Sequence, residues 1–450
     1  MTIMIRRKLF LRFIGLMVCV ILVWIYLPSH VPMNYENLKH SERKSNSSAE
    51  KLFNFDLLIN VIQSNDKQYN VTNEHRFSPL TDDNLVIVVQ VHQRLKYLQN
   101  LIDSLSKVKS IEETLIIFSH DVIDEQINNS IRRIGFAKIK QIFFPFSTQI
   151  WYNTFPGQSV DDCPRDIGKK KALEINCVNA GQPDSYGHYR EAKITQTKHH
   201  WWWKLWYVME HLPQTRNHHG DFLFIEEDHY VSPDLIHHWK LMKLSQKDLK
   251  ESDTVVDILT MGNYEFNVQK PINNVQAEMK KLNLTNWFSS KHNMAFTIDR
   301  ALWSRIKSCQ FAFCTFDDYN WDWSLQFIIN ECLKQKLCTL VTVVPRVFHT
   351  GTCGGLHHKQ KHCDENYEAN KLKNFFAQNH EYQFIDVVRI EKHSSPYRKR
   401  IKNNGGWSDR RDHQLCQQYQ FPFRKIFQQN PDFYRLLEND FSRFDIEQFK

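Results

Sequence analysis

The 450-residue sequence lacks three patterns that would assign it to common functional classes. No Cys-x-x-Cys pair occurs among its 10 cysteines, so a zinc cluster is not favoured. No Gly-x-Gly-x-x-Gly motif follows the first predicted strand, which weakens the case for a dinucleotide-dependent oxidoreductase. No DNA- or RNA-binding motif is present, and a net charge of +8 is small for a chain of this length. We therefore expect no nucleic-acid partner.

The composition is that of a globular protein, with 42% hydrophobic and 24% charged residues. Aromatic residues reach 13%, a high value that hints at ring-lined pockets, although most rings are expected in the core. The modest excess of positive charge suits an anionic ligand.

The N-terminus has the pattern of a membrane anchor. Residues 1–8 contain Arg6, Arg7 and Lys8 and are predicted to be a cytoplasmic tail. Residues 9–28 are predicted to be a transmembrane signal anchor, although their uncharged run is shorter than the about 20 residues of a typical span. A cleaved signal peptide is the alternative, but no clear small-x-small cleavage site follows. Residues 29–79 are polar and irregular, as in a stem, and residues 80–450 are predicted to form a luminal domain.

Two further features agree with a luminal location. Asn-x-Ser/Thr triplets make four asparagines candidates for glycosylation: Asn46, Asn70, Asn128 and Asn283. An oxidising lumen would pair most of the nine cysteines that follow Cys19, and the odd number leaves one over.

Strand and helix patterns alternate from the start of this domain. Residues 85–91 and 115–118 are apolar runs typical of buried parallel strands, each is followed by a helical pattern, and residues 138–146 are again strand-like. This order predicts a doubly wound α/β fold with a mostly parallel sheet flanked by helices. Ligands of such sheets bind beyond the carboxyl ends of the strands, where residues 90–94 and 119–121 are expected.

A later predicted strand, residues 222–225, ends in three consecutive acids: Glu226, Glu227 and Asp228. Three carboxylates at the ligand edge repel one another unless a cation is present. A hard divalent ion, Mg²⁺ or Mn²⁺, would satisfy them and bridge to phosphate oxygens. An acidic, solvated turn is the alternative.

The segment "TQTKHHWWWKLWYVMEHL" predicts a helix whose tryptophans mostly face the core. Gln196, Lys198, His199 and His200 come at its expected start, which is a natural site for an anion. These four residues are therefore better binding candidates than the tryptophans.

Two further positions have the residue types of a reaction site. Asp322 lies between Trp321 and Trp323, and a carboxylate beside rings suits a sugar hydroxyl held near a general base. The neighbouring acids at 317 and 318 include an expected helix cap. His349 ends another β-rich run and could be an Mn²⁺ ligand, although a lone histidine is more often structural.

Taken in order, the segments "QVHQR", "FSHD", "TQTKHHWWWKL", "EEDHY", "CTFDDYNWDW", "PRVFH" and "NNGGW" closely resemble the N-acetylglucosaminyltransferase II family. The resemblance covers roughly residues 84–416. It implies a GT-A glycosyltransferase fold, a single-pass type II location in the Golgi membrane and a catalytic domain in the lumen. It also implies that the chain uses Mn²⁺ and transfers GlcNAc from UDP-GlcNAc, in β-1,2 linkage, to the α-1,6-arm mannose of an N-glycan.

The resemblance implies a role for particular residues. Asp322 is the implied catalytic base, and Asp228 and His349 are the implied metal ligands. The implied nucleotide-sugar-binding residues are Gln90, Val91, His92, Gln93, Arg94, Asp121, Gln196, Thr197, Lys198, His199 and His200. Glu226 and Trp321 are expected to contact the acceptor glycan.

The family's disulfides imply the pairs Cys163–Cys177, Cys309–Cys332, Cys314–Cys416 and Cys353–Cys363, which leaves Cys338 unpaired. The sequence departs from the family in having no close cysteine pair after the acidic strand. Residues 262–276 also depart from the expected pattern near the sugar-binding loop. The sequence leaves open whether the chain pairs with a second copy as a homodimer.

The sequence is compatible with two other interpretations of function. One is a related glycosyltransferase with a different acceptor. The other is a glycan-binding protein built on an inactive transferase fold, against which the presence of Asp228, Asp322 and His349 argues.

Overall fold

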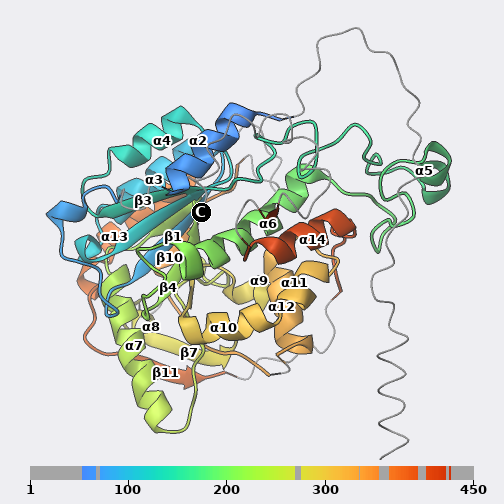
Figure 1. Cartoon of the computed structure of the whole chain (residues 1–450). Helices are drawn as coiled ribbons and strands as arrows, with labels where there is room; N and C mark the ends of the chain where they lie inside the picture. The colour runs from blue at the N-terminus through green and yellow to red at the C-terminus, as the bar shows by residue number, and fades with distance from the viewer. Residues whose placement is uncertain are drawn as a thin grey trace, which may run out of the picture. The chain divides into compact units, whose positions relative to one another are not determined.

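The computed structural model describes residues 53–66, 71–268, 275–333, 335–353, 364–393, 402–421 and 425–426. They belong to a compact unit that spans Lys51–Lys450. At its centre is a nine-stranded sheet in the order β11-β7-β9-β6-β8-β4-β1-β2-β3, with helices on both faces (Figure 1). The predicted anchor at 9–28 lies outside these ranges, and no helix within them is long and apolar enough to cross a membrane.

One half of the sheet is parallel. It contains β1 (Val86–Val91), β2 (Leu115–His120), β3 (Lys138–Phe143) and β4 (Phe222–Glu226), with β1 between β2 and β4. Val86 and Val88 pack into the apolar cluster on one face, whereas Ile87 and Val89 pack into the cluster on the other. Because both faces are covered, β1, β2 and β4 are largely apolar along their length. The predicted strand and helix alternation is therefore confirmed.

Helices separate into two layers according to the cluster that they join. The Val86 face is covered by α2 (Phe55–Asp66), α6 (Ala192–Trp206), α10 (Arg300–Ser308), α11 (Gln310–Thr315), α12 (Trp321–Glu331) and α14 (Arg410–Gln418). The Ile87 face is covered by α3 (Leu95–Leu105), α4 (Glu125–Arg132) and α7 (Leu235–Glu251). Leu58 and Val61 of α2 are buried in the core, so the compact unit begins earlier than the predicted boundary at residue 80.

The other half of the sheet is mixed. It consists of β6 (Ile258–Thr260), β7 (Lys281–Asn286), β8 (Phe296–Ile298), β9 (Cys338–Thr342) and β11 (Arg389–Lys392). β8 runs antiparallel to both β4 and β6, and β7 runs antiparallel to β9. A second, two-stranded sheet joins β5 (His229–Val231) to β10 (Val347–His349). The remaining helical elements are η2 (Glu74–Arg76), η3 (Ile111–Glu113), α5 (Lys169–Ile175), η4 (Tyr207–His211), α8 (Val275–Met279), α9 (Ser289–His292), α13 (Tyr367–Gln378) and η5 (His380–Tyr382).

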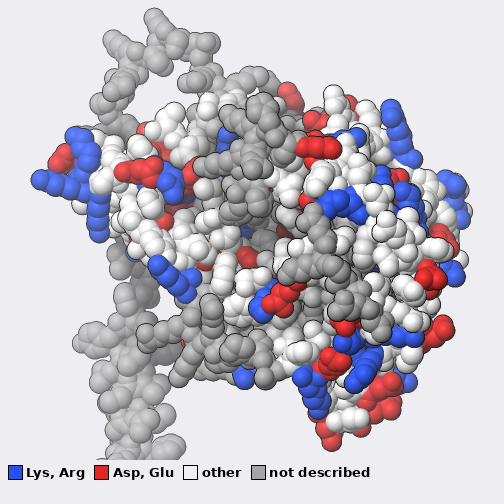
Figure 2. Space-filling model, turned by 180° about the vertical axis from the view of Figure 1, so that it is seen from behind, with Lys and Arg blue, Asp and Glu red and all other residues white. Residues whose placement is uncertain are grey.

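Charged side chains of both signs are interspersed on the face shown in Figure 2. Three consecutive lysines, at 169–171, are exposed on α5, where blue atoms gather at the left edge of that view. On this face, the positive charge is therefore not gathered into one broad stripe over the described residues.

Disulfides tie the described elements together as the family resemblance implied. The pairs Cys163–Cys177, Cys309–Cys332 and Cys314–Cys416 are all present. Cys353 is also disulfide-bonded, and its expected partner, Cys363, lies outside the described residues. Cys338 is a free thiol, as expected.

The four candidate glycosylation sites differ in their surroundings. Asn46 and Asn70 lie outside the described residues. Asn128 is only 3% exposed within α4, and this burial counts against a glycan there. Asn283 is half-buried in β7, between two other strands.

The Cys314–Cys416 bridge closes a loop with a sequence separation of 102 and joins α11 to α14. Replacing both cysteines with alanine should lower the free energy of unfolding by about 2–5 kcal/mol, because the unfolded chain regains loop freedom. Guanidinium unfolding followed by tryptophan fluorescence measures this change. Cys338→Ala is the matched control and should cost much less; an equal loss in both variants would contradict the prediction.

Candidate active site

The carboxyl ends of three parallel strands bring polar side chains together. Gln90 of β1 pairs with Ser119 of β2 on one side and with Glu226 of β4 on the other. The three positions lie at one edge of the sheet because the strands are parallel and in register. This edge is the expected place for a ligand in an α/β sheet.

Glu227 holds the turn that follows β1. Its Oε2 accepts a hydrogen bond from the backbone N–H of His92 at 2.8 Å, and its Oε1 accepts one from the backbone N–H of Arg94 at 3.2 Å. Burial raises the pKa of Glu227 to about 7, even though these bonds favour the ionised form. Glu227 is therefore a structural clamp on the segment 92–94.

Asp228 is the acid with the most cationic surroundings. The Nη1 of Arg94 donates to its Oδ2, and the Nε2 of His349 lies 3.2 Å from the same oxygen. Burial alone would raise the pKa of Asp228, but His349, His229 and Arg94 together hold it below its ordinary value. Its Oδ1 is buried without a hydrogen-bond partner among the described residues, which leaves one oxygen for a further cation.

Two short strands bring His349 to Asp228. In the antiparallel pair of β5 and β10, His349 lies opposite His229. The N–H and Oγ1 of Thr350 then donate to the backbone carbonyl of Asp228, at 2.8 and 2.7 Å. A Cβ on Gly351 would lie only 2.0 Å from Oδ2 of Asp228, so the chain must approach this carboxylate without a side chain.

The donor set fits a divalent cation. Glu226, Asp228 and His229 could offer ligand atoms within 4.8 Å of one another. However, Nδ1 of His229 already accepts the backbone N–H of Glu226 at 3.1 Å, and burial lowers its pKa to about 4. A neutral ring with Nδ1 as acceptor carries its proton on Nε2. The better donors are therefore Oδ1 of Asp228 and the imidazole of His349, a set that suits Mn²⁺.

Asp121, at the end of β2, joins two of the predicted segments. Its Oδ1 lies 2.6 Å from Nδ1 of His92, and its Oδ2 accepts from Nε2 of Gln196 at 3.0 Å. Nδ1 of His200 lies 3.6 Å from Oδ2, and Nε2 of the same ring is 2.8 Å from Oγ of Ser119. The structure thus brings His92, Asp121, Gln196 and His200 into one cluster.

Other members of the predicted nucleotide-sugar set lie elsewhere. The side chain of Val91 belongs to the core, Gln93 is exposed and Thr197 is half-buried. Residues 196–200 are not at a helix start, because α6 already begins at Ala192. The expectation of an anion site at that start is therefore wrong.

Lys198 and His199 turn away from Asp121. Nζ of Lys198 donates to the carbonyls of Phe316 and Asp318. Nε2 of His199 lies 2.9 Å from Asp412, and its Nδ1 is 2.7 Å from the hydroxyl of Tyr419. The helical period separates these two residues from their neighbours 196 and 200.

Lys204 belongs to this edge and was missed from the sequence. Its Nζ donates to Oε1 of Gln90 at 2.7 Å, and burial lowers its pKa to about 7. Burial and the charge of Asp228 raise the pKa of Glu226 to about 7, and Lys204 opposes that shift. The spacing 196, 200, 204 follows one helix face and could have identified Lys204.

Asp322 projects from the first turn of α12. Its Oδ2 accepts from Oγ of Ser289 and from Nδ2 of Asn293, both at 2.7 Å. Burial raises the pKa of Asp322 despite these bonds. The charge of Asp322 also helps to raise the pKa of Glu226, so the two carboxyl groups are electrostatic neighbours.

Two aromatic residues frame this region differently. Trp321 is buried and stacks on Trp201, with ring centroids 4.4 Å apart. Tyr264 is 47% exposed as a whole residue. Burial of its hydroxyl, together with the negative charges of Glu226, Asp228 and Asp322, raises the pKa of that hydroxyl. The ring of Tyr264 therefore lies nearer to open space above the acids than the ring of Trp321 does.

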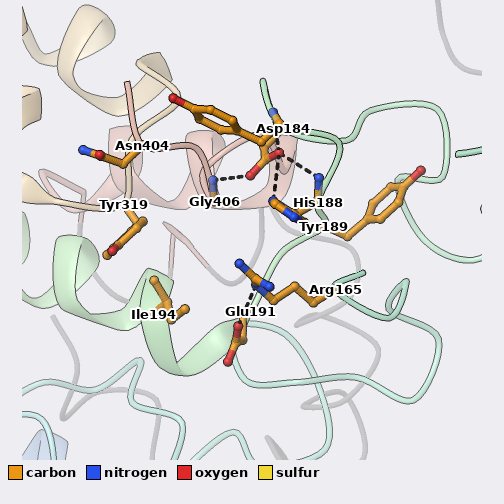
Figure 3. Close-up of a pocket in the computed structure, with 10 residues that line it drawn as sticks. Arg165, Asp184, His188, Tyr189, Glu191, Ile194, Tyr319, Asn404 and Gly406 are labelled. Carbon is orange, nitrogen blue, oxygen red and sulfur yellow. Dashed lines mark hydrogen bonds and ion pairs between the residues drawn. The ribbon is translucent and has the colours of Figure 1, made fainter. Parts of the chain in front are cut away.

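A pocket of about 180 Å³ lies beside the start of α12 (Figure 3). Asp184 accepts three backbone N–H groups, from Tyr186, His188 and Gly406, each at 2.8 Å. The lining of the pocket combines charged, amide and aromatic side chains: Arg165, Asp184, Tyr186, His188, Tyr189, Glu191, Ile194, Tyr319, Asn404 and Gly406. Polar groups that converge beside rings suit a sugar.

Comparison with known proteins gives a consistent result. A model of the family N-acetylglucosaminyltransferase II matches residues 59–416. The α-1,6-mannosyl-glycoprotein 2-β-N-acetylglucosaminyltransferase of Sus scrofa is 43% identical over 336 residues, covering 74% of this chain and 73% of that protein. The Homo sapiens protein of the same name is 44% identical over 341 residues, with coverage of 74% and 73%. The Arabidopsis thaliana protein of that name is 31% identical over 380 residues, with coverage of 82% and 84%.

Similarity to solved structures is weaker. The crystal structure of S. aureus TarS 1–349 has 11% sequence identity and a TM-score of 0.28, covering 66% of this chain and 72% of that one. A score this low supports no argument about fold or function.

Substitution can separate the two histidines as metal ligands. His349→Ala should weaken Mn²⁺ binding, measured by calorimetry without nucleotide, by roughly 10–100-fold or more, because it removes a donor. His229→Gln should leave the affinity nearly unchanged, since Nδ1 of His229 is already used by a backbone N–H. A loss of affinity in His229→Gln, with the affinity of His349→Ala retained, would instead place the ion on the cluster of Glu226, Asp228 and His229.

Proposed function

The chain belongs to the N-acetylglucosaminyltransferase II family, and we propose that it transfers GlcNAc from UDP-GlcNAc, in β-1,2 linkage, to the α-1,6-arm mannose of N-glycans. The observation that carries this proposal is the meeting of Asp228, His349 and Asp322 around one sheet edge. For the mixed α/β domain we propose the GT-A fold. The ligand edge at β1, β2 and β4 supports this assignment.

The donor would bind at this edge. Asp228 and His349 would hold a divalent ion, which we propose to be Mn²⁺, and the ion would act as a Lewis acid on the diphosphate leaving group. Arg94 and Lys204 add positive charge at the same edge. Arg94 contacts Asp228, and a hydrogen bond to Gln90 holds Lys204 there. The cluster of His92, Asp121 and Gln196 offers donors and acceptors that would orient the nucleotide.

The acceptor would approach from the side of Asp322. In an inverting displacement, the mannose 2-hydroxyl oxygen forms a bond to the anomeric carbon while the bond from that carbon to UDP breaks. Asp322 takes the hydroxyl proton, and Ser289 and Asn293 keep its carboxylate oriented. Because burial raises the pKa of Asp322, its carboxylate is a stronger base than an exposed aspartate.

The pocket in Figure 3 would receive a further part of the acceptor glycan. Tyr319, three residues before Asp322, forms one of its walls. A branched acceptor whose mannose reaches Asp322 could therefore extend a second branch toward Arg165, Asp184 and Glu191. This placement would make the pocket a recognition site rather than a reaction site.

The proposed location in the cell rests on the sequence of the N-terminus. We propose that residues 9–28 anchor the chain in the Golgi membrane and that the compact unit lies in the lumen. The three disulfides between described residues support an oxidising compartment.

The proposed activity is tested with the full chain in detergent, UDP-GlcNAc, Mn²⁺ and a panel of defined N-glycan acceptors. The expected product is a glycan heavier by a single GlcNAc, β-1,2-linked on the α-1,6 arm, and its formation should stop with EDTA. Transfer to a different arm would favour a related transferase. Binding of UDP without transfer to any acceptor would favour the inactive, glycan-binding reading.

Asp322→Asn should lower kcat by about 10²–10⁴-fold, because the amide cannot take the hydroxyl proton. The affinity for UDP in the presence of Mn²⁺ should remain near that of the unsubstituted chain. Asp299→Asn is the matched control, since its carboxylate also lies at a helix start but caps α10 by accepting the N–H of Leu302. Near-normal kcat in Asp322→Asn would remove it as the base.

The raised pKa of Asp322 sets the acidic limit of the reaction. The base must be unprotonated, and a raised pKa means that the proton returns at a higher pH than for an exposed aspartate. With saturating Mn²⁺ and donor, kcat should therefore fall as pH decreases, with a midpoint above the ordinary value of 3.8. A midpoint at or below that value would contradict the assignment, and UDP affinity over the same range is the control.

A further inference from the structure

Lys198 lies on the opposite side of α6 from Gln196 and His200, the two residues of this helix that contact Asp121. It is 0% exposed, and its Nζ donates to the carbonyls of Phe316 at 3.0 Å and Asp318 at 2.9 Å. Its ammonium also lies over the ring of Trp407, 4.4 Å from the centroid. These contacts belong to the segment that leads into α12, not to the edge that would hold UDP.

The segment that Lys198 holds is continuous with the start of α12. Oδ1 of Asp318 accepts the N–H of Asn320 at 2.9 Å, and Asn320 occupies the N-cap position of α12. Oγ of Ser324 lies 2.9 Å from the Asn320 carbonyl and 3.2 Å from the Asp318 carbonyl, and the N–H of Ser324 donates to the Asn320 carbonyl at 3.1 Å. Asp318 therefore connects Lys198 to the start of α12, from which Asp322 projects: its carbonyl accepts from Lys198, and its carboxylate accepts from the N–H of Asn320.

A second contact from α6 supports the same turn. Trp201, one helical turn beyond Lys198, stacks on Trp321 with an interplanar angle of 7°. Trp321 directly precedes Asp322. Lys198 and Trp201 thus fix the backbone before the base and the side chain beside it.

An ammonium group in this place is costly. A buried charge loses its hydration, and burial lowers the pKa of Lys198 to about 7 while the nearby carboxylates of Asp318, Asp317 and Asp412 oppose that shift. An apolar side chain would pack against Phe313 and Trp407 without this cost. What an apolar side chain could not do is donate hydrogen bonds to two backbone carbonyls of the segment, those of Phe316 and Asp318.

We infer that Lys198 is a positioning residue of the reaction, which fixes the start of α12 and hence the place of the Asp322 carboxylate. The inference rests on the proposed function, in which Asp322 is the base. It departs from the family resemblance, which implied that Lys198 binds the nucleotide sugar. Gln196 and His200 contact Asp121 from the other side of the same helix, so α6 would connect the donor side to the base side.

The test compares Lys198→Met with Lys138→Met in the full chain. Lys138 is a matched control because it is 3% exposed and its Nζ also donates to backbone carbonyls, those of Ser78, Glu112 and Glu113. Both variants should lose stability. Lys198→Met alone should lower kcat, by roughly 10–100-fold, since a small displacement of a reacting group is sufficient for such a loss. Its affinity for UDP with Mn²⁺ and its KM for UDP-GlcNAc should stay within about 2-fold, because Gln196 and His200 are untouched.

Two outcomes would overturn the inference. Weaker UDP binding with kcat retained at saturating donor would make Lys198 a nucleotide ligand. An equal kcat in Lys198→Met and Lys138→Met would reduce its role to stability alone. Should Lys198→Met not fold, Ser324→Ala removes the hydroxyl that lies within hydrogen-bond distance of the Asp318 and Asn320 carbonyls at the start of α12. This variant should lower kcat by a smaller factor, and an unchanged kcat would again overturn the inference.

The activity of the unsubstituted chain separates this inference from the proposed function. Absence of transfer by that chain would contradict the proposed function itself. Normal transfer by that chain, together with an unaltered kcat in Lys198→Met, would overturn only the role of Lys198.

Discussion

Three consecutive carboxylates at the end of a buried strand are the constraint around which this site is arranged. The negative charge of each of these acids is stabilised by different partners. Glu227 accepts two backbone N–H groups, and Asp228 contacts Arg94 and His349. Glu226 lies near Lys204. These partners come from the turn after β1, from β10 and from α6, so satisfying the acids draws three distant parts of the chain together. The remaining oxygen of Asp228 is where a divalent ion would complete the arrangement.

Helix α6 connects these strand ends to the segment before α12. One face presents Gln196, His200 and Lys204 to the strand ends. The opposite face carries Lys198 and His199, which bond to the segment before α12 and to Asp412 of α14. A helix with so many buried polar groups is stable only because each of these groups has a specific partner, and those partners belong to both sides of the proposed reaction.

Much of the fold and part of the site could be predicted from the sequence for physical reasons. Apolar runs predict β1, β2 and β4, and the three acids at the end of β4 predict a ligand site at that edge of the sheet. Lys198 and His199 contact groups away from Asp121, because the helical period divides the contiguous motif between different faces of α6. Lys204 was missed since its role depends on Gln90, 114 positions earlier. Residues 53–66 resembled a stem because α2 is polar on the side that faces solvent.

The central claim is that Asp228 and His349 hold the ion on which the donor diphosphate rests, with Asp322 facing it as the base. Anomalous scattering from Mn²⁺ in crystals grown with UDP measures this most directly. The account predicts a manganese peak bonded to the Asp228 carboxylate and the His349 imidazole, next to the diphosphate, at the ends of β1, β2 and β4. A peak on Glu226 and His229, or UDP bound away from this edge, would contradict it.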